Sequence, residues 1–99
     1  MEYISTRNNK KIFTFEEVFL KGLAPDGGLF VPNKIPEFSF EELKRFKDFS
    51  YEELATEIIF KFCSNEFSEK EIKNLVKNSY RNFRIKEVVA IRKLGNINL

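Results

Sequence analysis

Two short segments carry the residues best suited to binding an anion. Ser5, Thr6 and Arg7 place two hydroxyls and a guanidinium in succession near the start of the chain. A guanidinium fits bidentate contact with a phosphate or a carboxylate. Asp26, Gly27 and Gly28 offer a stretch of backbone whose N–H groups are little covered by side chains. We expect the two segments to form one wall of a substrate site that accepts an anionic group.

The same residues also have a purely structural interpretation. Pro, Asp and Gly dominate ordinary turns, so residues 22–32 are typical of a plain connection between a helix and a strand. Arg7 is then expected to pair with Asp26 or another carboxylate and to pin the N-terminal strand to this loop. An Arg7→Ala change separates the interpretations, because a substrate contact affects turnover whereas a structural pair affects thermal stability.

The loop itself is dense in residues that fix a backbone path. Residues 22–32 hold three of the four glycines and two of the three prolines of the chain. Gly22 suits the left-handed position that ends a helix. The order Ala-Pro-Asp-Gly over residues 24–27 favours a type I turn. Gly28 adds a position for positive φ or for the close approach of another group.

The residue types needed for several kinds of catalysis are missing. The chain has no histidine and one cysteine, which excludes the common zinc centres and the commonest general base. No glycine-rich loop of the Walker or dinucleotide type precedes a helix. Cys63 has no histidine to activate it, so we expect Cys63 to serve as a small buried apolar residue. These residues alone make neither a catalytic nor a metal site.

Composition limits the class of protein. Ninety-nine residues with 42% hydrophobic content and twelve phenylalanines indicate one globular domain. No apolar run approaches the roughly 18 residues of a membrane span, and no secretory signal opens the chain. A single cysteine predicts a cytoplasmic location. The net charge of +2 gives no argument for nucleic acid. The basic residues gathered over 73–93 indicate a solvated face or, alternatively, a stripe for phosphate groups or a partner.

Four copies of one local device predict four helices. In each copy a Ser or Thr is followed three residues later by a Glu, and a Phe precedes the cap as a hydrophobic staple. The pairs are Thr14 with Glu17, Ser39 with Glu42, Ser50 with Glu53, and Ser68 with Glu71. Helical spacing predicts the buried faces Leu43, Phe46 and Phe49; Tyr51, Leu54, Ala55, Ile58 and Phe62; and Ile72, Leu75, Val76, Tyr80 and Phe83.

Strand signals are fewer. Residues 2–5, 29–31 and 88–91 are predicted strands, residues 93–96 a turn, and residues 97–99 the start of a further strand. The sequence therefore predicts an α+β fold, with four short helices packed on a small β-sheet. Which strands pair is left open.

Several of these segments together resemble a known family. Tyr3-Ile4-Ser5-Thr6-Arg7, then Phe13 to Val18, Gly22 to Pro32 and Ile35 to Phe38 are similar to the N-terminal region of threonine synthase. The resemblance is strongest over residues 3–38 and looser, but in register, to the end. One departure is Asn8, which stands where the family usually has Gly; Asn tolerates the left-handed conformation better than most residues.

The resemblance implies both a reaction and a set of missing parts. Threonine synthase is a fold-type II pyridoxal-phosphate enzyme that converts O-phospho-L-homoserine and water to L-threonine and phosphate. Its Schiff-base lysine and cofactor-phosphate loop lie beyond the point where this chain ends, so no lysine here takes that role. Residues 1–99 are then the N-terminal domain. They would pack against absent C-terminal cofactor domains near the active-site entrance, binding no cofactor and being inactive alone. The alternative is a free-standing, non-catalytic helical module for protein–protein interaction.

Overall fold

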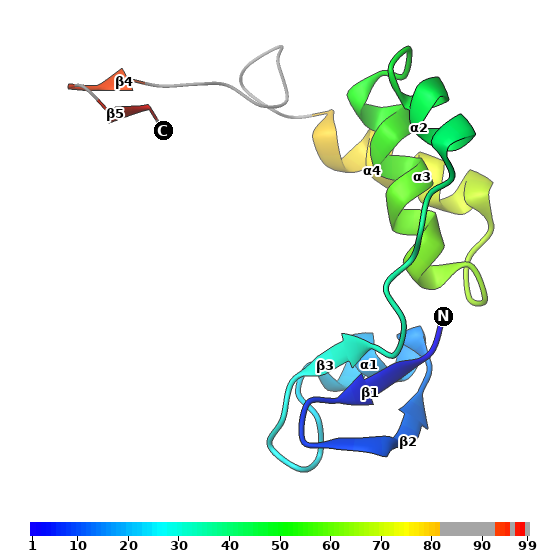
Figure 1. Cartoon of the computed structure of the whole chain (residues 1–99), viewed down its shortest axis with the longest axis vertical. Coiled ribbons are helices and arrows are strands. Elements are labelled where there is room, and N and C mark those ends of the chain that lie inside the picture. The colour runs from blue at the N-terminus through cyan, green and yellow to red at the C-terminus, as the bar shows by residue number, and fades with distance from the viewer. Residues whose placement is uncertain (82–92, 96, 99) are drawn as a thin grey trace.

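A computed structural model describes residues 1–81, 93–95 and 97–98 of the chain. Within these residues the chain forms four helices, a three-stranded sheet and a two-stranded hairpin, as the sequence predicts for an α+β fold (Figure 1). The elements are β1 (Tyr3–Ser5), β2 (Asn8–Phe13), α1 (Phe15–Lys21), β3 (Phe30–Pro32), α2 (Phe40–Phe46), α3 (Tyr51–Cys63), α4 (Glu69–Tyr80), β4 (Lys93–Leu94) and β5 (Ile97–Asn98).

The three-stranded sheet is antiparallel with β1 at its centre. Its order is β2-β1-β3, and β1 pairs with β3 through Tyr3 opposite Pro32 and Ser5 opposite Phe30. On the other side Ser5 lies opposite Asn8, so only two residues connect β1 to β2. The sequence did not predict β2. Its first five residues are all exposed, so they show no alternation of apolar and polar side chains, and lysines are typical of such an edge strand.

The helices begin at the four predicted caps. The boxes at Thr14, Ser39 and Ser68 are complete, with the cap hydroxyl and the glutamate each accepting a backbone N–H. At α3 the structure gives the first half alone: Ser50 Oγ accepts from the Glu53 amide at 3.2 Å. A full box was predicted there, but the bond to the cap hydroxyl is sufficient to start the helix.

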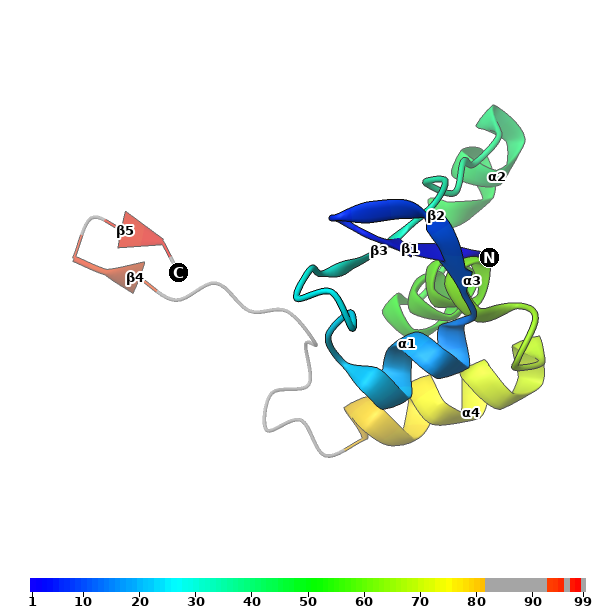
Figure 2. The ribbon, with the colours of Figure 1, turned by 90° about the horizontal axis from the view of Figure 1, so that it is seen from below.

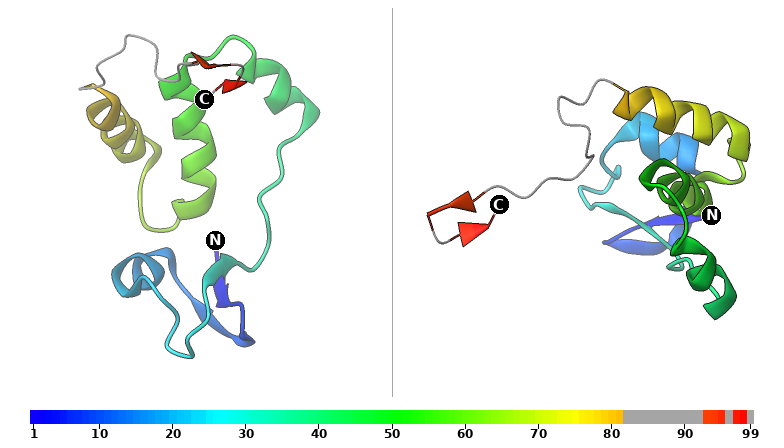
Figure 3. Two further views of the ribbon diagram at one scale, coloured as in Figure 1. Left: turned by 90° about the vertical axis from the view of Figure 1, so that its left-hand side faces the viewer. Right: turned by 90° about the horizontal axis from the view of Figure 1, so that it is seen from above.

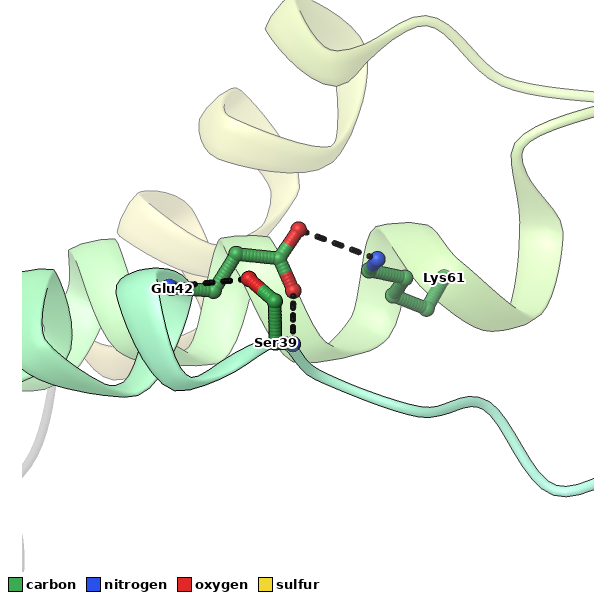
Figure 4. A network of polar contacts seen from close by, with 3 residues as sticks. All are labelled: Ser39, Glu42 and Lys61. Carbon is green, nitrogen blue, oxygen red and sulfur yellow. Dashed lines mark hydrogen bonds and ion pairs between the residues drawn. The ribbon is translucent and has the colours of Figure 1, made fainter.

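One capping box also joins two helices. Ser39 Oγ accepts from the Glu42 amide at 3.1 Å, and the Glu42 carboxylate accepts from the Ser39 amide at 3.0 Å (Figure 4). The second oxygen of that carboxylate lies 3.5 Å from Lys61 Nζ on α3. The Ser39 amide is the main cause that lowers the pKa of Glu42, and Lys61 adds to it. The carboxylate therefore remains ionised and ties α2 to α3.

The core lies between α3 and α4, which run side by side (Figure 3). Cys63, Ile72 and Val76 are its buried residues, and Phe15 of α1 packs against them. Cys63 is 1% exposed, which confirms the prediction of a small buried residue. Tyr3 connects the sheet to this core, since its hydroxyl donates to the Phe62 main-chain oxygen at 2.6 Å.

The predicted helix faces are only partly buried. Leu75 is 52% exposed, Leu43 52% and Tyr51 43%, although helical spacing placed all three in the core. In the described residues α3 packs mainly against α4, so one narrow stripe of each helix is covered and the rest of the apolar face is not. Phe83 lies outside the described residues.

The predicted C-terminal elements are partly described. Strand 88–91 lies outside the described residues. The predicted strand at 97–99 is present as β5, and it pairs with β4. The prediction of a turn over 93–96 was wrong at its start, because Lys93 and Leu94 form β4 and the turn follows at Gly95, whose φ is +61°.

Candidate functional site

Sheet pairing brings the two candidate segments together. Ser5 ends β1, and Thr6 and Arg7 form the connection to β2. The loop that contains Asp26, Gly27 and Gly28 runs directly into β3, the other neighbour of β1. The Thr6 amide donates to the Leu29 main-chain oxygen at 2.8 Å, which extends the β1–β3 pairing by one residue. All six predicted residues therefore lie in one cluster.

The Asp26 carboxylate is the centre of this cluster. It accepts from Ser5 Oγ at 2.7 Å and from the Gly28 amide at 2.9 Å. The Ser5 hydroxyl in turn accepts from the Arg7 amide at 3.1 Å. The hydrogen bond from Ser5 is the main cause that lowers the pKa of Asp26, followed by that from Gly28, so the carboxylate is ionised at neutral pH.

Arg7 holds the loop from outside. Its Nη1 donates to the Asp26 main-chain oxygen at 3.2 Å, so it contacts the carbonyl of Asp26 where a carboxylate partner was expected. The guanidinium is exposed, and the described residues give its Nε and Nη2 atoms no hydrogen-bond partner. Those N–H groups are donors that the cluster itself leaves unused.

Two glycines are required by this geometry. Gly27 has φ of +82°, and its amide donates to the Ala24 main-chain oxygen at 3.0 Å, which confirms a four-residue turn. A Cβ at Gly28 would lie within 3.0 Å of Ser5 Oγ, Thr6 Oγ1 and Asp26 Oδ1. Gly28 is therefore needed because other groups approach it closely. This is one of the two roles that the sequence predicted for it, the other being a positive φ.

Two backbone expectations need correction or completion. Gly22 has φ of +73° as predicted, but its ψ of −57° is not left-handed helical; the Leu23 amide donates to the Lys21 oxygen, which makes a γ-turn. Asn8 does not adopt positive φ. It is the first residue of β2, and its side-chain oxygen accepts from the Lys10 amide at 2.9 Å, so this position needs no glycine.

Lys11 is a cation at the cluster that sequence reasoning missed. A shallow hollow of about 100 Å³ is lined by Ser5, Asn8, Lys11, Phe13, Pro25 and Asp26. Lys11 lies on β2, which pairs with β1, and this pairing brings it to the hollow. The Nζ of Lys11 lies 5.2 Å from the centre of the Phe13 ring. The only sequence signal was the run of two lysines at 10–11, which carries no information until β2 is recognised.

The cluster carries charges of both signs, with the ionised Asp26 at its centre, and two of its donors are already used. Asp26 takes the Ser5 hydroxyl and the Gly28 amide, so Arg7 and Lys11 are the cations left at its edge. The described residues contain no group of three or more His, Cys, Asp or Glu that could hold a metal ion. None of their helices is long and apolar enough to cross a membrane.

Comparison with known families gives this geometry its context. A family model described as "Threonine synthase N terminus" matches residues 2–80. The chain belongs to this threonine synthase N-terminal family. Threonine synthase of Schizosaccharomyces pombe is 41% identical over 97 residues, covering 97% of this chain and 19% of the relative. Threonine synthase of Pseudomonas aeruginosa is 36% identical over 95 residues, covering 96% of this chain and 20% of the relative.

A solved structure extends the family likeness to three dimensions. The crystal structure of PLP-bound threonine synthase from Brucella melitensis matches with a TM-score of 0.84 and 31% identity. The match covers 94% of this chain and 20% of that one. This threonine synthase N-terminal chain thus spans about a fifth of the length of the relatives that it matches.

Proposed function

We propose that this chain is the N-terminal domain of a pyridoxal-phosphate-dependent threonine synthase, which converts O-phospho-L-homoserine and water to L-threonine and phosphate. The observation that carries the proposal is the match to PLP-bound threonine synthase over 94% of the chain, with a TM-score of 0.84. The family match over residues 2–80 supports it from sequence. The free cysteine agrees with a reducing, cytoplasmic location.

The described residues of this chain do not fit the cofactor. A lysine that forms a Schiff base needs an enclosed position beside groups that hold the pyridoxal phosphate. The lysine side chains that the structure describes are exposed, apart from Lys61, which is half-buried and paired with Glu42. We therefore assign cofactor binding to the larger part of the enzyme that this chain does not span, and expect residues 1–99 alone to be inactive.

The contribution of this domain is proposed to be one wall of the substrate site. Arg7 offers an exposed guanidinium, and Thr6 offers a hydroxyl whose oxygen already accepts from the Leu29 amide at 3.0 Å. Ser5, Asp26, Gly27 and Gly28 then act as positioning residues, because their hydrogen bonds and glycine backbone fix the place of Arg7. The phosphate of the substrate is the group that this wall would meet.

The test uses the full-length enzyme, carrying residues 1–99 and loaded with pyridoxal phosphate. It should release phosphate from O-phospho-L-homoserine, whereas residues 1–99 alone should not. Arg7→Ala should lower kcat/KM by about tenfold or more, because a charge-assisted bidentate contact is lost. Arg45→Ala, on the exposed surface of α2, is the matched control and should leave kcat/KM unchanged. Unchanged turnover with a lower Tm in the Arg7 variant would show that Arg7 only pins the loop.

A further inference from the structure

An apolar groove lies between α1, α3 and α4, away from the Arg7 cluster. Residues of all three helices line it together. In Figure 2, which looks along the longest axis from below, α1 and α4 overlap. The volume of the groove is about 290 Å³. Nearly all of its lining is apolar, and the residues that line it include Phe15, Phe19, Ile59, Phe67, Leu75 and Tyr80.

The side chains along the groove are exposed to an unusual degree. Phe19 is 75% exposed, Leu75 52% and Ile59 41%. Across the described residues, twelve large hydrophobic side chains are exposed, whereas six hydrophobic residues form the buried core. Scattered exposed apolar residues are ordinary, but several gathered around one apolar groove mark an interaction site.

The chemistry of the groove favours a protein surface over a small molecule. Sites for small molecules carry a few polar groups that fix the orientation of the ligand. Ser79 lines the groove, but its hydroxyl already donates to the Leu75 main-chain oxygen at 2.7 Å. Tyr80 is engaged with Tyr51, whose ring centre lies 5.2 Å from its own. The groove therefore presents apolar surface with little that could orient a ligand.

We propose that this groove is the docking site for the rest of the threonine synthase polypeptide, from which an apolar segment inserts between α1 and α4. The inference rests on the proposed function. Relatives carry the same domain as about a fifth of a longer chain, and the Brucella melitensis chain superposes on it closely. A covalently linked segment is present at an effective concentration of roughly millimolar, so a small groove is sufficient to hold it. A second copy of the chain has no such advantage.

The experiment compares two phenylalanines in the full-length protein. Phe19 lines the groove at 75% exposure, and Phe40 begins α2 at 69% exposure, away from the groove. Each also makes one surface ring contact within this domain, Phe19 with Phe15 and Phe40 with Lys44. Phe19→Ser and Phe40→Ser are therefore matched in residue type, in exposure and in the loss of one ring contact within this domain. Leu75→Ser is a second groove variant, on α4.

Native-state proteolysis of residues 1–81 in the full-length protein is the measurement. Phe19→Ser and Leu75→Ser should each speed cleavage, by roughly tenfold for Phe19, because apolar contact with the inserted segment is lost. Phe40→Ser should match the wild type. Equal rates for all variants would overturn the proposal. Unchanged proteolysis with loss of a concentration-dependent oligomer in Phe19→Ser would overturn it in favour of a second copy.

The same samples separate this inference from the proposed function. Phosphate release from O-phospho-L-homoserine by the wild-type protein tests the reaction, and it does not depend on the difference between Phe19→Ser and Phe40→Ser. A wild-type protein without that activity, but with faster cleavage in the groove variants, would leave the docking site standing and refute the reaction.

Discussion

Gly28→Ala should disrupt the candidate site more than any other small change in the loop. Its Cβ would lie within 3.0 Å of Ser5 Oγ, Thr6 Oγ1 and Asp26 Oδ1. The nearest of these oxygens belongs to Ser5, which is 3% exposed and hydrogen-bonded to Asp26 at 2.7 Å. Because these groups are held by the β1–β3 pairing, the new methyl group must push apart a packed site.

The size of the effect follows from this crowding. Overpacking a well-ordered site costs about 1–3 kcal/mol, so we expect the free energy of unfolding to fall by about 2 kcal/mol. For a domain of this size, this loss of free energy corresponds to a Tm lower by roughly 8 °C or more. The Tm is measured by far-ultraviolet circular dichroism. In a Ser5→Ala background the nearest oxygen is absent, so Gly28→Ala should cost about 1 kcal/mol less.

Gly22→Ala is the matched control. Gly22 has open space around the position of a Cβ but φ of +73°, so an alanine there meets backbone strain without a steric clash. We expect a cost of about 1–2 kcal/mol that is the same with and without Ser5→Ala. The reasoning is refuted if Gly28→Ala leaves the Tm unchanged, or if its cost does not depend on Ser5.

Four further outcomes are expected. Tyr3→Phe removes the hydroxyl that donates to the Phe62 oxygen, so urea unfolding should show a loss of about 1 kcal/mol, and a Tm equal to the wild type would contradict this. Burial is the first cause that raises the pKa of Tyr3. The contribution of the Tyr3 hydroxyl to the free energy of unfolding should therefore be complete below pH about 10 and be lost above it. Tyr3→Phe should not show this loss. The Ser5 hydrogen bond is the first cause that lowers the pKa of Asp26, so stability should fall as the pH drops below about 4; Asp26→Asn should flatten that part of the Tm–pH curve, and an unchanged slope would count against the assignment. Burial raises the pKa of the Cys63 thiol, and the side chain is 1% exposed, so a thiol reagent should modify it at the rate of unfolding; rapid labelling of the folded protein would be incompatible with this core.

Local signals in the sequence were sufficient for the helices. Ser39 and Glu42 are three residues apart, so the bonds that start α2 form within one turn and need nothing from elsewhere in the chain. The same holds at Thr14 and Ser68. The family resemblance likewise rests on contiguous motifs, and the match over residues 2–80 confirms it.

Strand β2 shows where such signals fail. It is an exposed edge strand rich in Asn and Lys, and its conformation is fixed by backbone hydrogen bonds to β1. A sequence pattern reports which side chains are buried, and β2 buries one residue, Phe13. The arrival of Lys11 at the candidate site could not be foreseen for the same reason.

The sequence by itself determined the starts of the helices, the turn at residues 24–27 and the membership in the threonine synthase family, because each depends on residues close together along the chain. Only the tertiary structure decided how Ser5, Arg7 and Asp26 meet, since Ser5 and Asp26 are joined across 21 positions by the pairing of β1 with β3. It also decided that Arg7 holds a carbonyl oxygen of Asp26, leaving the carboxylate to Ser5 and Gly28. Which partner a polar side chain takes depends on distances across the fold, and those are fixed only when the strands pair.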